Sequence, residues 1–197
     1  MTVDEARDVG GDGEGAEDGE TVEAVVALGA NLGDRAATLD VAVAELDGLP
    51  DTALVVASRW HDSVALTPEG LNPDKPPYLN GVVVLRTRLA PHALLHKLRR
   101  VERAHGRDRS GTAPRWGDRT LDLDLVVHGD ARLETSELTL PHPRAHERDF
   151  VLRPWLEVRP DAVVPGQGAV AELLARVTAA GESTVEPATA PETEGRS

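Results

Sequence analysis

The residues best suited to chemistry in this chain lie in one ten-residue segment, Arg115–Asp124, which reads RWGDRTLDLD. The leucines that alternate with Asp122 and Asp124 predict a strand, on which residues two apart face the same side. The two carboxylates then project together and repel each other unless a cation lies between them. Hard oxygen ligands of this kind suit Mg²⁺, which keeps some of its waters and takes phosphate oxygens as further ligands. Taken alone, the pair fits an exposed strand face with alternating polar residues equally well.

Arginines crowd the loop before this pair, which is rich in glycine and proline; they are Arg107, Arg109, Arg115 and Arg119. Guanidinium groups beside a carboxylate–metal pair suit phosphoryl transfer, which depends mostly on positioning and on stabilising oxygen charge. The chain has no GxxxxGK(S/T) sequence, so a nucleotide would not be held by a P-loop. The glycines of Gly29–Gly33 (GANLG) instead fit a turn between a strand and a helix. We therefore expect the arginines to bind the phosphates.

Hydrophobic spacing and turn residues predict the elements that must position these side chains. Asp34 can cap a first helix that Gly48 and Pro50 end, and a second helix is expected from Pro91 to His105. Strands are expected over Val22–Ala30, Thr52–Leu66, Tyr78–Leu89 and Leu121–Val127. The order β-α-β-β-α-β describes an α+β fold, the ferredoxin-like sandwich, in which one antiparallel sheet carries two helices on one face.

A C-terminal extension is expected to follow this unit. Its pattern predicts a hairpin over Ala131–Leu140, a helical or irregular piece over Arg144–Leu156 and a last helix over Ala169–Val177. Between the second and third strands, Thr67–Pro77 contains four prolines and is expected to form a loop.

Acidic residues gather at both ends of the 197-residue chain. Of a net charge of −13, residues 1–23 carry −8 and residues 182–197 carry −3, which leaves −2 for residues 24–181. Both ends lack the apolar side chains that would offset the entropy of ordering them. We therefore expect disordered tails at 1–22 and 179–197 around one domain at 23–178. An acidic chain is also a poor partner for nucleic acid.

Several classes of protein are disfavoured by what the composition lacks. There is no cysteine, which excludes disulfides and thiolate metal sites and fits a cytoplasmic protein. No apolar run approaches the ~20 residues that span a bilayer, so no membrane contact is expected. The first residues have neither the basic start nor the apolar run of a signal peptide.

Six short motifs follow one another along residues 24–175: ALGANL at 27–32, YLN at 78–80, RVE with GR at 100–107, RWGDRTLDLDL at 115–125, LPH at 140–142 and RDF at 148–150. In this order they resemble the family of 6-hydroxymethyl-7,8-dihydropterin pyrophosphokinases of folate biosynthesis. The resemblance implies the ferredoxin-like fold reached above from the order of elements. It also implies an enzyme, expected to be a monomer, that transfers pyrophosphate from ATP to the hydroxymethyl group of 6-hydroxymethyl-7,8-dihydropterin and releases AMP.

The resemblance further implies which residues form the site. Asp122 and Asp124 would hold two Mg²⁺ ions and, with Arg109 and Arg119, form the catalytic set. The pterin-binding set would be Ser63, Leu66, Tyr78, Asn80, Trp116 and Phe150. The nucleotide-binding set would be Arg99, Glu102, Arg107, Arg109, Arg115, Trp116, Arg119, Leu125, Thr139, His142 and Arg148. Tyr78 and Phe150 are the only Tyr and Phe of the chain, and without the resemblance they would be interpreted as core residues.

The chain differs from the family pattern around the pterin. His61–Ala65 (HDSVA) stands where members often carry Tyr-x-Thr-x-Pro, the loop from Leu66 to Pro77 is longer, and Asp118 replaces a common proline. The residues leave the general base open between Asp124, a water and a phosphate oxygen. One alternative is a catalytically silent homologue that binds pterin or nucleotide. An RNA-binding module is disfavoured, because the chain is acidic and lacks an aromatic RNP pattern.

Overall fold

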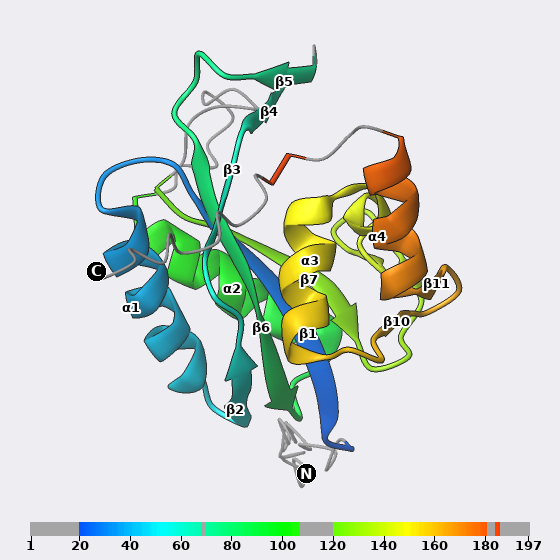
Figure 1. Cartoon of the computed structure of the whole chain (residues 1–197). Helices are drawn as coiled ribbons and strands as arrows, with labels where there is room; N and C mark the ends of the chain where they lie inside the picture. Colours follow the sequence, from blue (N-terminus) through cyan, green and yellow to red (C-terminus); the bar gives the residue numbers. More distant parts are fainter. Residues whose placement is uncertain (1–19, 68–69, 107–119, 181–183, 186–197) are drawn as a thin grey trace, which may run out of the picture.

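An antiparallel sheet runs through the middle of the molecule, and helices cover both of its faces (Figure 1). The computed structural model describes residues 20–67, 70–106, 120–180 and 184–185. Residues 1–19 of the expected N-terminal tail and the arginine-rich loop at 107–119 lie outside the described residues, and Val22, at the end of that tail, begins a strand.

The helices and strands follow the predicted order closely. The helices are α1 (Arg35–Asp47), α2 (Pro91–Ala104), the 3₁₀ turn η1 (Ala145–Glu147), α3 (Asp149–Val158) and α4 (Val170–Ala179). The strands are β1 (Val22–Ala30), β2 (Thr52–Ala57), β3 (His61–Ser63), β4 (Ala65–Thr67), β5 (Gly70–Asn72), β6 (Tyr78–Thr87), β7 (Asp122–His128), β8 (Leu133–Glu134), β9 (Thr139–Leu140), β10 (Val163–Val164) and β11 (Gly168–Ala169). The predicted hairpin is β8 and β9, and the predicted last helix is α4.

The central sheet has the order β2-β6-β1-β7, and β3 pairs with the same edge of β6 further along. Every pairing in it is antiparallel. β1 is its middle strand, paired with β6 on one side and β7 on the other. The α+β class is thereby confirmed.

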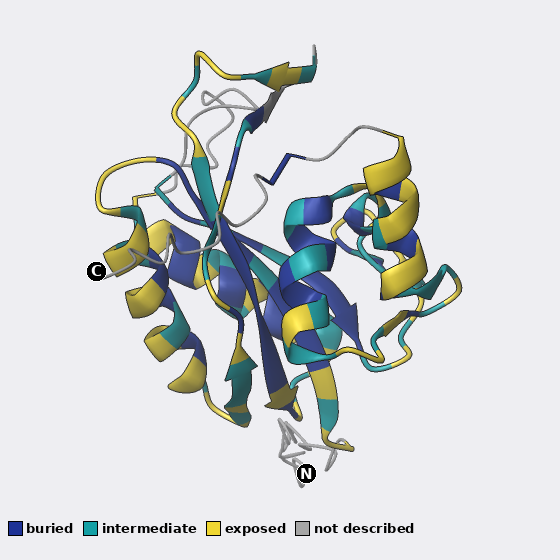
Figure 2. Ribbon diagram, viewed as in Figure 1, coloured by how far each residue is buried: buried dark blue, intermediate teal, exposed yellow. Residues whose placement is uncertain are grey.

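Two apolar clusters flank the sheet, because alternate residues of each strand face opposite sides. On β1, Ala24, Val26 and Leu28 pack with α1 and α2, whereas Val25 packs with α3 and α4. The dark centre of Figure 2 shows these buried strands and the inner sides of the helices against them. The sequence predicts two helices on one face, and the last two helices cover the other.

Local signals in the sequence explain where the first helices begin. The carboxylate of Asp34 accepts a hydrogen bond from the backbone N–H of Ala37 (3.1 Å) and so caps α1. Pro91 occupies the first position of α2, where its missing N–H is not needed. Both predictions are confirmed.

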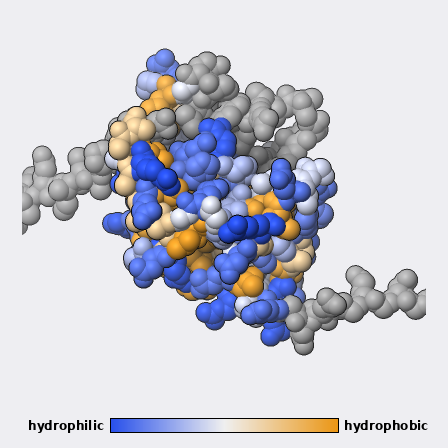
Figure 3. Space-filling view, turned by 90° about the vertical axis from the view of Figure 1, so that its right-hand side faces the viewer, coloured by the Kyte–Doolittle hydropathy of each residue, from blue (hydrophilic) through white to orange (hydrophobic). Residues whose placement is uncertain are grey.

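The outer side of the molecule over α4, which Figure 3 turns toward the viewer, mixes hydrophilic and hydrophobic side chains. Among the described residues the exposed large hydrophobic side chains are Leu32, Val41, Leu71 and Val163, each on a different segment. None of the described helices is long and apolar enough to cross a membrane.

The prediction of one second strand over Thr52–Leu66 is wrong, because the strand breaks at Ser58–Trp60. Ser58 still bonds to Val82 of β6 through its backbone N–H and its hydroxyl, but a Cβ on Gly81 would lie only 2.6 Å from the ring of Trp60. The chain therefore leaves the sheet to place the indole over a residue without a side chain.

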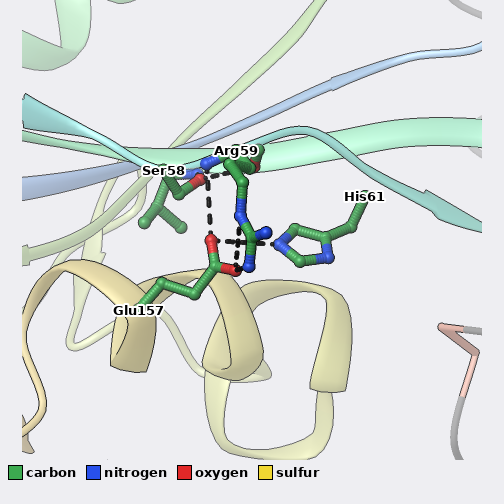
Figure 4. A network of polar contacts seen from close by, with 5 residues as sticks. Ser58, Arg59, His61 and Glu157 are labelled. Carbon is green, nitrogen blue, oxygen red and sulfur yellow. Dashed lines mark hydrogen bonds and ion pairs between the residues drawn. The ribbon is translucent and has the colours of Figure 1, made fainter. Parts of the chain in front are cut away.

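Glu157 of α3 fixes this break to the helix (Figure 4). Its carboxylate accepts hydrogen bonds from the backbone and the guanidinium of Arg59 and lies 3.2 Å from Nε2 of His61. The start of β3 is thus attached to the C-terminal part of α3.

The proline-rich segment 67–77 is not wholly a loop. Gly70–Asn72 forms β5, which pairs with β4 in a small hairpin that projects beyond the central sheet (Figure 1). The prediction missed β5 because the prolines of this segment flank it and do not interrupt it.

Two residues of the segment 179–197, which is expected from its composition to be a disordered tail, pack against the body of the protein. Thr184 and Val185 are 5% and 6% exposed, and Val185 forms a β-bridge with Ser63. Composition does not predict this contact, because two residues can bind to the body through backbone hydrogen bonds without an apolar run.

Candidate functional site

A cavity of about 580 Å³ opens on the α3 face of the sheet. Along this face the valines of β1 and β6 lie under α3 and α4. Further along the strands, where the face is polar, the cavity begins. Its walls come from β1, β3, β6, β7, α2, the β8–β9 hairpin and the start of α3.

The carboxylates of β7 form one wall. Asp122 and Asp124 both line the cavity. The intervening Leu123 borders it too, and also belongs to the apolar cluster under α1 and α2. Glu102 of α2 is fully buried, and its carboxylate accepts a hydrogen bond from the backbone N–H of Leu123 (3.0 Å). Glu102 therefore fixes β7 from behind and does not line the cavity.

Basic side chains lie directly opposite Asp124. Nη1 of Arg148 donates a hydrogen bond to Oδ2 of Asp124 (3.2 Å), and Nε2 of His142 lies 3.8 Å from the same oxygen. Burial lowers the pKa of His142 and outweighs the carboxylate of Asp124, which raises it. Burial thus favours the neutral form of His142. Its Nδ1 accepts a hydrogen bond from the backbone N–H of Arg144 (3.2 Å), which leaves Nε2 as the donor facing Asp124.

Two arginines hold donors that suit an anion in the cavity. Nε of Arg148 and Nε of Arg99 are buried, and neither has a hydrogen-bond partner among the described residues. Nη2 of Arg99 donates to the backbone oxygen of Glu137 in the β8–β9 hairpin (3.3 Å), which holds this side chain at the rim. Buried donors of this kind are costly unless a ligand accepts from them.

The opposite wall combines aromatic rings with a buried amide. Nδ2 of Asn80 donates to Oγ of Ser63 (2.7 Å), and both residues are buried. Tyr78 and Phe150 line the same cavity. The guanidinium of Arg148 lies 5.6 Å from the centre of the Phe150 ring, so the aromatic and the cationic walls meet there.

Gly29 forms the floor between the two walls. It pairs with Asn80 on β6 and with Asp122 on β7, which puts the three residues in one row across the sheet. Neighbouring strands lie about 4.8 Å apart, so the amide and the carboxylate project from backbones about 10 Å apart. A Cβ on Gly29 would lie 3.0 Å from Oδ1 of Asn80. Glycine keeps this floor open.

The carboxylates fit Mg²⁺ ions that share their ligands with a substrate. No group of three or more His, Cys, Asp or Glu residues that could hold a metal occurs among the described residues. Asp122 and Asp124 offer hard oxygens side by side in a cavity with room for phosphates, which is how Mg²⁺ is commonly held in proteins.

Most of the expected site residues that the structure describes come together in this cavity. They are Ser63, Tyr78, Asn80, Arg99, Asp122, Asp124, Leu125, Thr139, His142, Arg148 and Phe150. Leu66 lies on β4. Glu102 is the exception described above. Arg107, Arg109, Arg115, Trp116 and Arg119 lie outside the described residues.

The structure adds lining residues that sequence reasoning missed. Thr135–Leu138 between β8 and β9, and Arg144, border the cavity. The hairpin was predicted, but its contact with α2, through the hydrogen bond from Arg99 to the backbone oxygen of Glu137, was not. Gly29 was interpreted only as part of a turn; its position beside Asn80 and Asp122 follows from strand register.

Comparison with known proteins indicates the same family as the sequence motifs do. A model of the family 7,8-dihydro-6-hydroxymethylpterin-pyrophosphokinase (HPPK) matches residues 25–160. The 2-amino-4-hydroxy-6-hydroxymethyldihydropteridine pyrophosphokinase of Haemophilus influenzae is 37% identical over 153 residues, 78% of this chain and 91% of that protein. The protein of the same name from Synechocystis is 43% identical over 145 residues, 74% of this chain and 70% of that protein.

Solved structures share the fold at low sequence identity. HPPK-DHPS of Plasmodium falciparum, wild type with pterin and p-hydroxybenzoate, superimposes with a TM-score of 0.63 at 13% identity over 87% of this chain. A structure titled HPPK-DHPS in complex with substrates gives 0.59 at 14% identity over 82% of this chain. This chain spans 46% and 44% of those chains, respectively. From the match of the family model and the identity to its relatives, the chain belongs to the 7,8-dihydro-6-hydroxymethylpterin-pyrophosphokinase family.

Proposed function

We propose that this chain transfers pyrophosphate from ATP to the hydroxymethyl group of 6-hydroxymethyl-7,8-dihydropterin and releases AMP. The observation that supports the proposal is that one cavity has two walls of different chemical character. The Asp122–Asp124 wall with Arg148 suits phosphates, and the wall of Tyr78, Asn80 and Phe150 suits a flat heteroaromatic ring.

The pterin is placed between the rings of Tyr78 and Phe150. Its edge carries donors and acceptors that need partners when buried, and the amide of Asn80 offers both. Ser63 accepts from one amide hydrogen of Asn80 and so fixes which side of the amide faces the ligand.

The triphosphate is placed along β7 toward the start of α3. The buried Nε atoms of Arg99 and Arg148 donate to phosphate oxygens, and Nε2 of neutral His142 adds a third donor. Arg107, Arg109, Arg115 and Arg119, together with Trp116, complete this set by family resemblance.

Asp122 and Asp124 would hold Mg²⁺, two ions by family resemblance, together with the phosphates. When bound, Mg²⁺ neutralises charge on the phosphates and draws electron density from the phosphorus under attack. Asp124 keeps its orientation through the hydrogen bond from Arg148.

The reaction is an in-line displacement at the β-phosphorus. The hydroxymethyl oxygen forms a bond to this phosphorus while the bond to the oxygen of the α-phosphate breaks, and AMP carries that oxygen away. The hydroxyl proton passes to Asp124, a water or a phosphate oxygen. The row formed by Asn80, Gly29 and Asp122 sets the distance between the pterin and the phosphates.

We further assign the sheet and its first two helices to the ferredoxin-like type, supported by the strand order β2-β6-β1-β7. We also expect a monomer, since the exposed large hydrophobic side chains of the described residues lie on separate segments. A cytoplasmic location stays a prediction from the cysteine-free composition.

An AMP-release assay tests the proposal. Purified chain with Mg²⁺, ATP and 6-hydroxymethyl-7,8-dihydropterin is expected to form AMP and the pterin pyrophosphate in equal amounts. Omission of the pterin controls for ATP hydrolysis, and omission of Mg²⁺ for the metal requirement. Ligand binding without AMP formation would instead identify the silent homologue, which the named relatives do not favour.

A further inference from the structure

Asp149, at the first position of α3, holds the described C-terminal residues. It is completely buried. Its carboxylate accepts hydrogen bonds from the backbone N–H of Thr184 (3.0 Å), the hydroxyl of Thr184 (2.5 Å) and the backbone N–H of Val185 (3.1 Å). A buried carboxylate is stable only when donors surround it, so Asp149 and these two residues fix one another.

The same two residues also form the outer neighbour of β3. Val185 bridges Ser63 in an antiparallel arrangement, and the backbone N–H of Val64 donates to the oxygen of Thr184 (3.0 Å). In Figure 1 this short segment, coloured red, lies between β3 and α3. Thr184–Val185 therefore joins the edge of the sheet to the start of a helix on its face.

Both attachment points adjoin the cavity. Ser63 of β3 and the following Val64 line it, and so do the two chain neighbours of Asp149, Arg148 and Phe150. Ser63 also carries the hydrogen bond that orients Asn80. The contact thus links the wall with the amide to the wall with the Phe150 ring.

We propose that Asp149, with Thr184–Val185, is a positioning device for the pterin side of the cavity: it fixes the spacing between Phe150 and the Ser63–Asn80 pair. The inference rests on the proposed function, because it names the pterin as the ligand whose binding depends on this spacing. β3 has only three residues, and without Thr184–Val185 it becomes the outermost strand at this end of the sheet.

The alternative is that the contact serves folding alone. A folding role lowers thermal stability and the fraction of active enzyme, and so lowers the apparent kcat with both KM values unchanged. A positioning role raises KM for the pterin more than KM for ATP. Asp122, Asp124 and His142 are held by β7 and the β8–β9 region, and of the described residues proposed to bind phosphate only Arg148 adjoins Asp149. The two roles therefore separate in steady-state kinetics.

Two truncated chains provide the matched pair. One ends at residue 183 and lacks Thr184–Val185; the other ends at Ala188 and keeps them. We expect KM for the pterin to rise about tenfold in the shorter chain, with KM for ATP within about twofold of the full chain. The chain that ends at Ala188 is expected to have the same KM for the pterin and for ATP as the full chain.

Point variants keep the test valid if the shorter chain does not fold. Thr184→Val removes the hydroxyl that bonds to Asp149, and Asp149→Asn places N–H groups against the donors of Thr184 and Val185. Both are expected to raise KM for the pterin. Thr184→Ser keeps the hydroxyl and is expected to have the KM for the pterin of the unaltered chain.

Glu157→Gln is the control variant. It alters the other attachment of β3 to α3, at Arg59 and His61, which do not line the cavity. It weakens the bonds to Arg59 and His61 in Figure 4 and is expected to lower the melting temperature without changing KM for the pterin. The inference is overturned if Asp149→Asn and Thr184→Val leave KM for the pterin unchanged, or raise KM for ATP as much. Failure of the full chain to release AMP would instead overturn the proposed function.

Discussion

At the scale of single residues, the two strands that flank β1 contribute different chemical groups to the cavity. β7 contributes charge through Asp122 and Asp124, and β6 contributes a ring and an amide through Tyr78 and Asn80. Between Asn80 and Asp122, β1 contributes no side chain, because Gly29 occupies that position of the row. The chemistry therefore depends as much on a missing Cβ as on the charged groups.

Loss of either cavity carboxylate is expected to abolish turnover without unfolding the protein. Asp122→Ala or Asp124→Ala removes a metal ligand and is expected to lower kcat about 10³-fold. Steady-state AMP release at saturating Mg²⁺ measures the loss, and circular dichroism checks the fold. Asp130→Ala, at an exposed turn after β7, is the matched control. A third of normal activity in either cavity variant would refute the metal assignment.

Gly29→Ala is expected to weaken pterin binding more than ATP binding. Its Cβ would lie 3.0 Å from Oδ1 of Asn80 and 3.8 Å from Tyr78, so the amide must shift away from its bond with Ser63. We expect a rise in KM for the pterin of about 10-fold, equivalent to about 1.4 kcal/mol. Gly48→Ala at the end of α1, where a Cβ meets nothing closer than 3.5 Å, is the control. Equal effects of both variants on KM would contradict the role of Gly29.

At the scale of elements, α3 has a structural and a functional end. Its first turn carries Arg148 and Phe150 at the cavity, and its last turn carries Glu157, which holds the break between β2 and β3. β3 is consequently fixed to α3 at both ends. The end held through Thr184–Val185 is the one that carries Ser63 of the cavity wall.

The bonds of Glu157 make a pH-dependent contribution to stability. Burial by itself raises the pKa of Glu157, but hydrogen bonds from Arg59 and His61 outweigh it, and the pKa lies below its ordinary value of 4.5. The contribution is therefore present above pH 4.5 and disappears as the pH falls through the lowered pKa.

Glu157→Gln is accordingly expected to reduce the free energy of unfolding near pH 7 by up to about 1 kcal/mol. The difference from the unaltered chain should shrink toward zero as the pH falls below the ordinary pKa of a carboxyl. Urea unfolding at a series of pH values between 3 and 8 measures this. A difference that does not shrink below pH 4.5 would show that the stated cause is wrong.

At the scale of the whole molecule, the described body is a sheet with helices on both faces, and most of the negative charge of the chain lies in residues 1–23 and 182–197. These two acidic segments are not equivalent. Thr184 and Val185, within the C-terminal one, are buried against β3 and α3.

Deletion of residues 1–19 is expected to leave the melting temperature and both KM values unchanged, because their composition offers little apolar surface for burial. Deletion of 184–197 is expected to lower the melting temperature, since it removes the bonds to Asp149. Differential scanning calorimetry of both variants makes the comparison. A drop of several degrees for the N-terminal deletion would show that this segment packs on the body.

Local patterns in the sequence predict most of the helices and strands and the pair of carboxylates on β7. Strong local signals gave β1, the cap of α1 at Asp34 and the start of α2 at Pro91, because each depends on neighbouring residues alone. The alternation on β7 likewise predicted that Asp122 and Asp124 share one side.

Tertiary structure decided what depends on residues far apart in the chain. The role of Gly29 follows from the register of three strands, and the burial of Glu102 follows from the packing of α2 behind β7. The docking of Thr184–Val185 rests on backbone groups and one buried carboxylate, which leave no periodic pattern in the sequence. Hydrophobic spacing reports which face of an element is buried, and only the assembled fold shows which polar groups meet there.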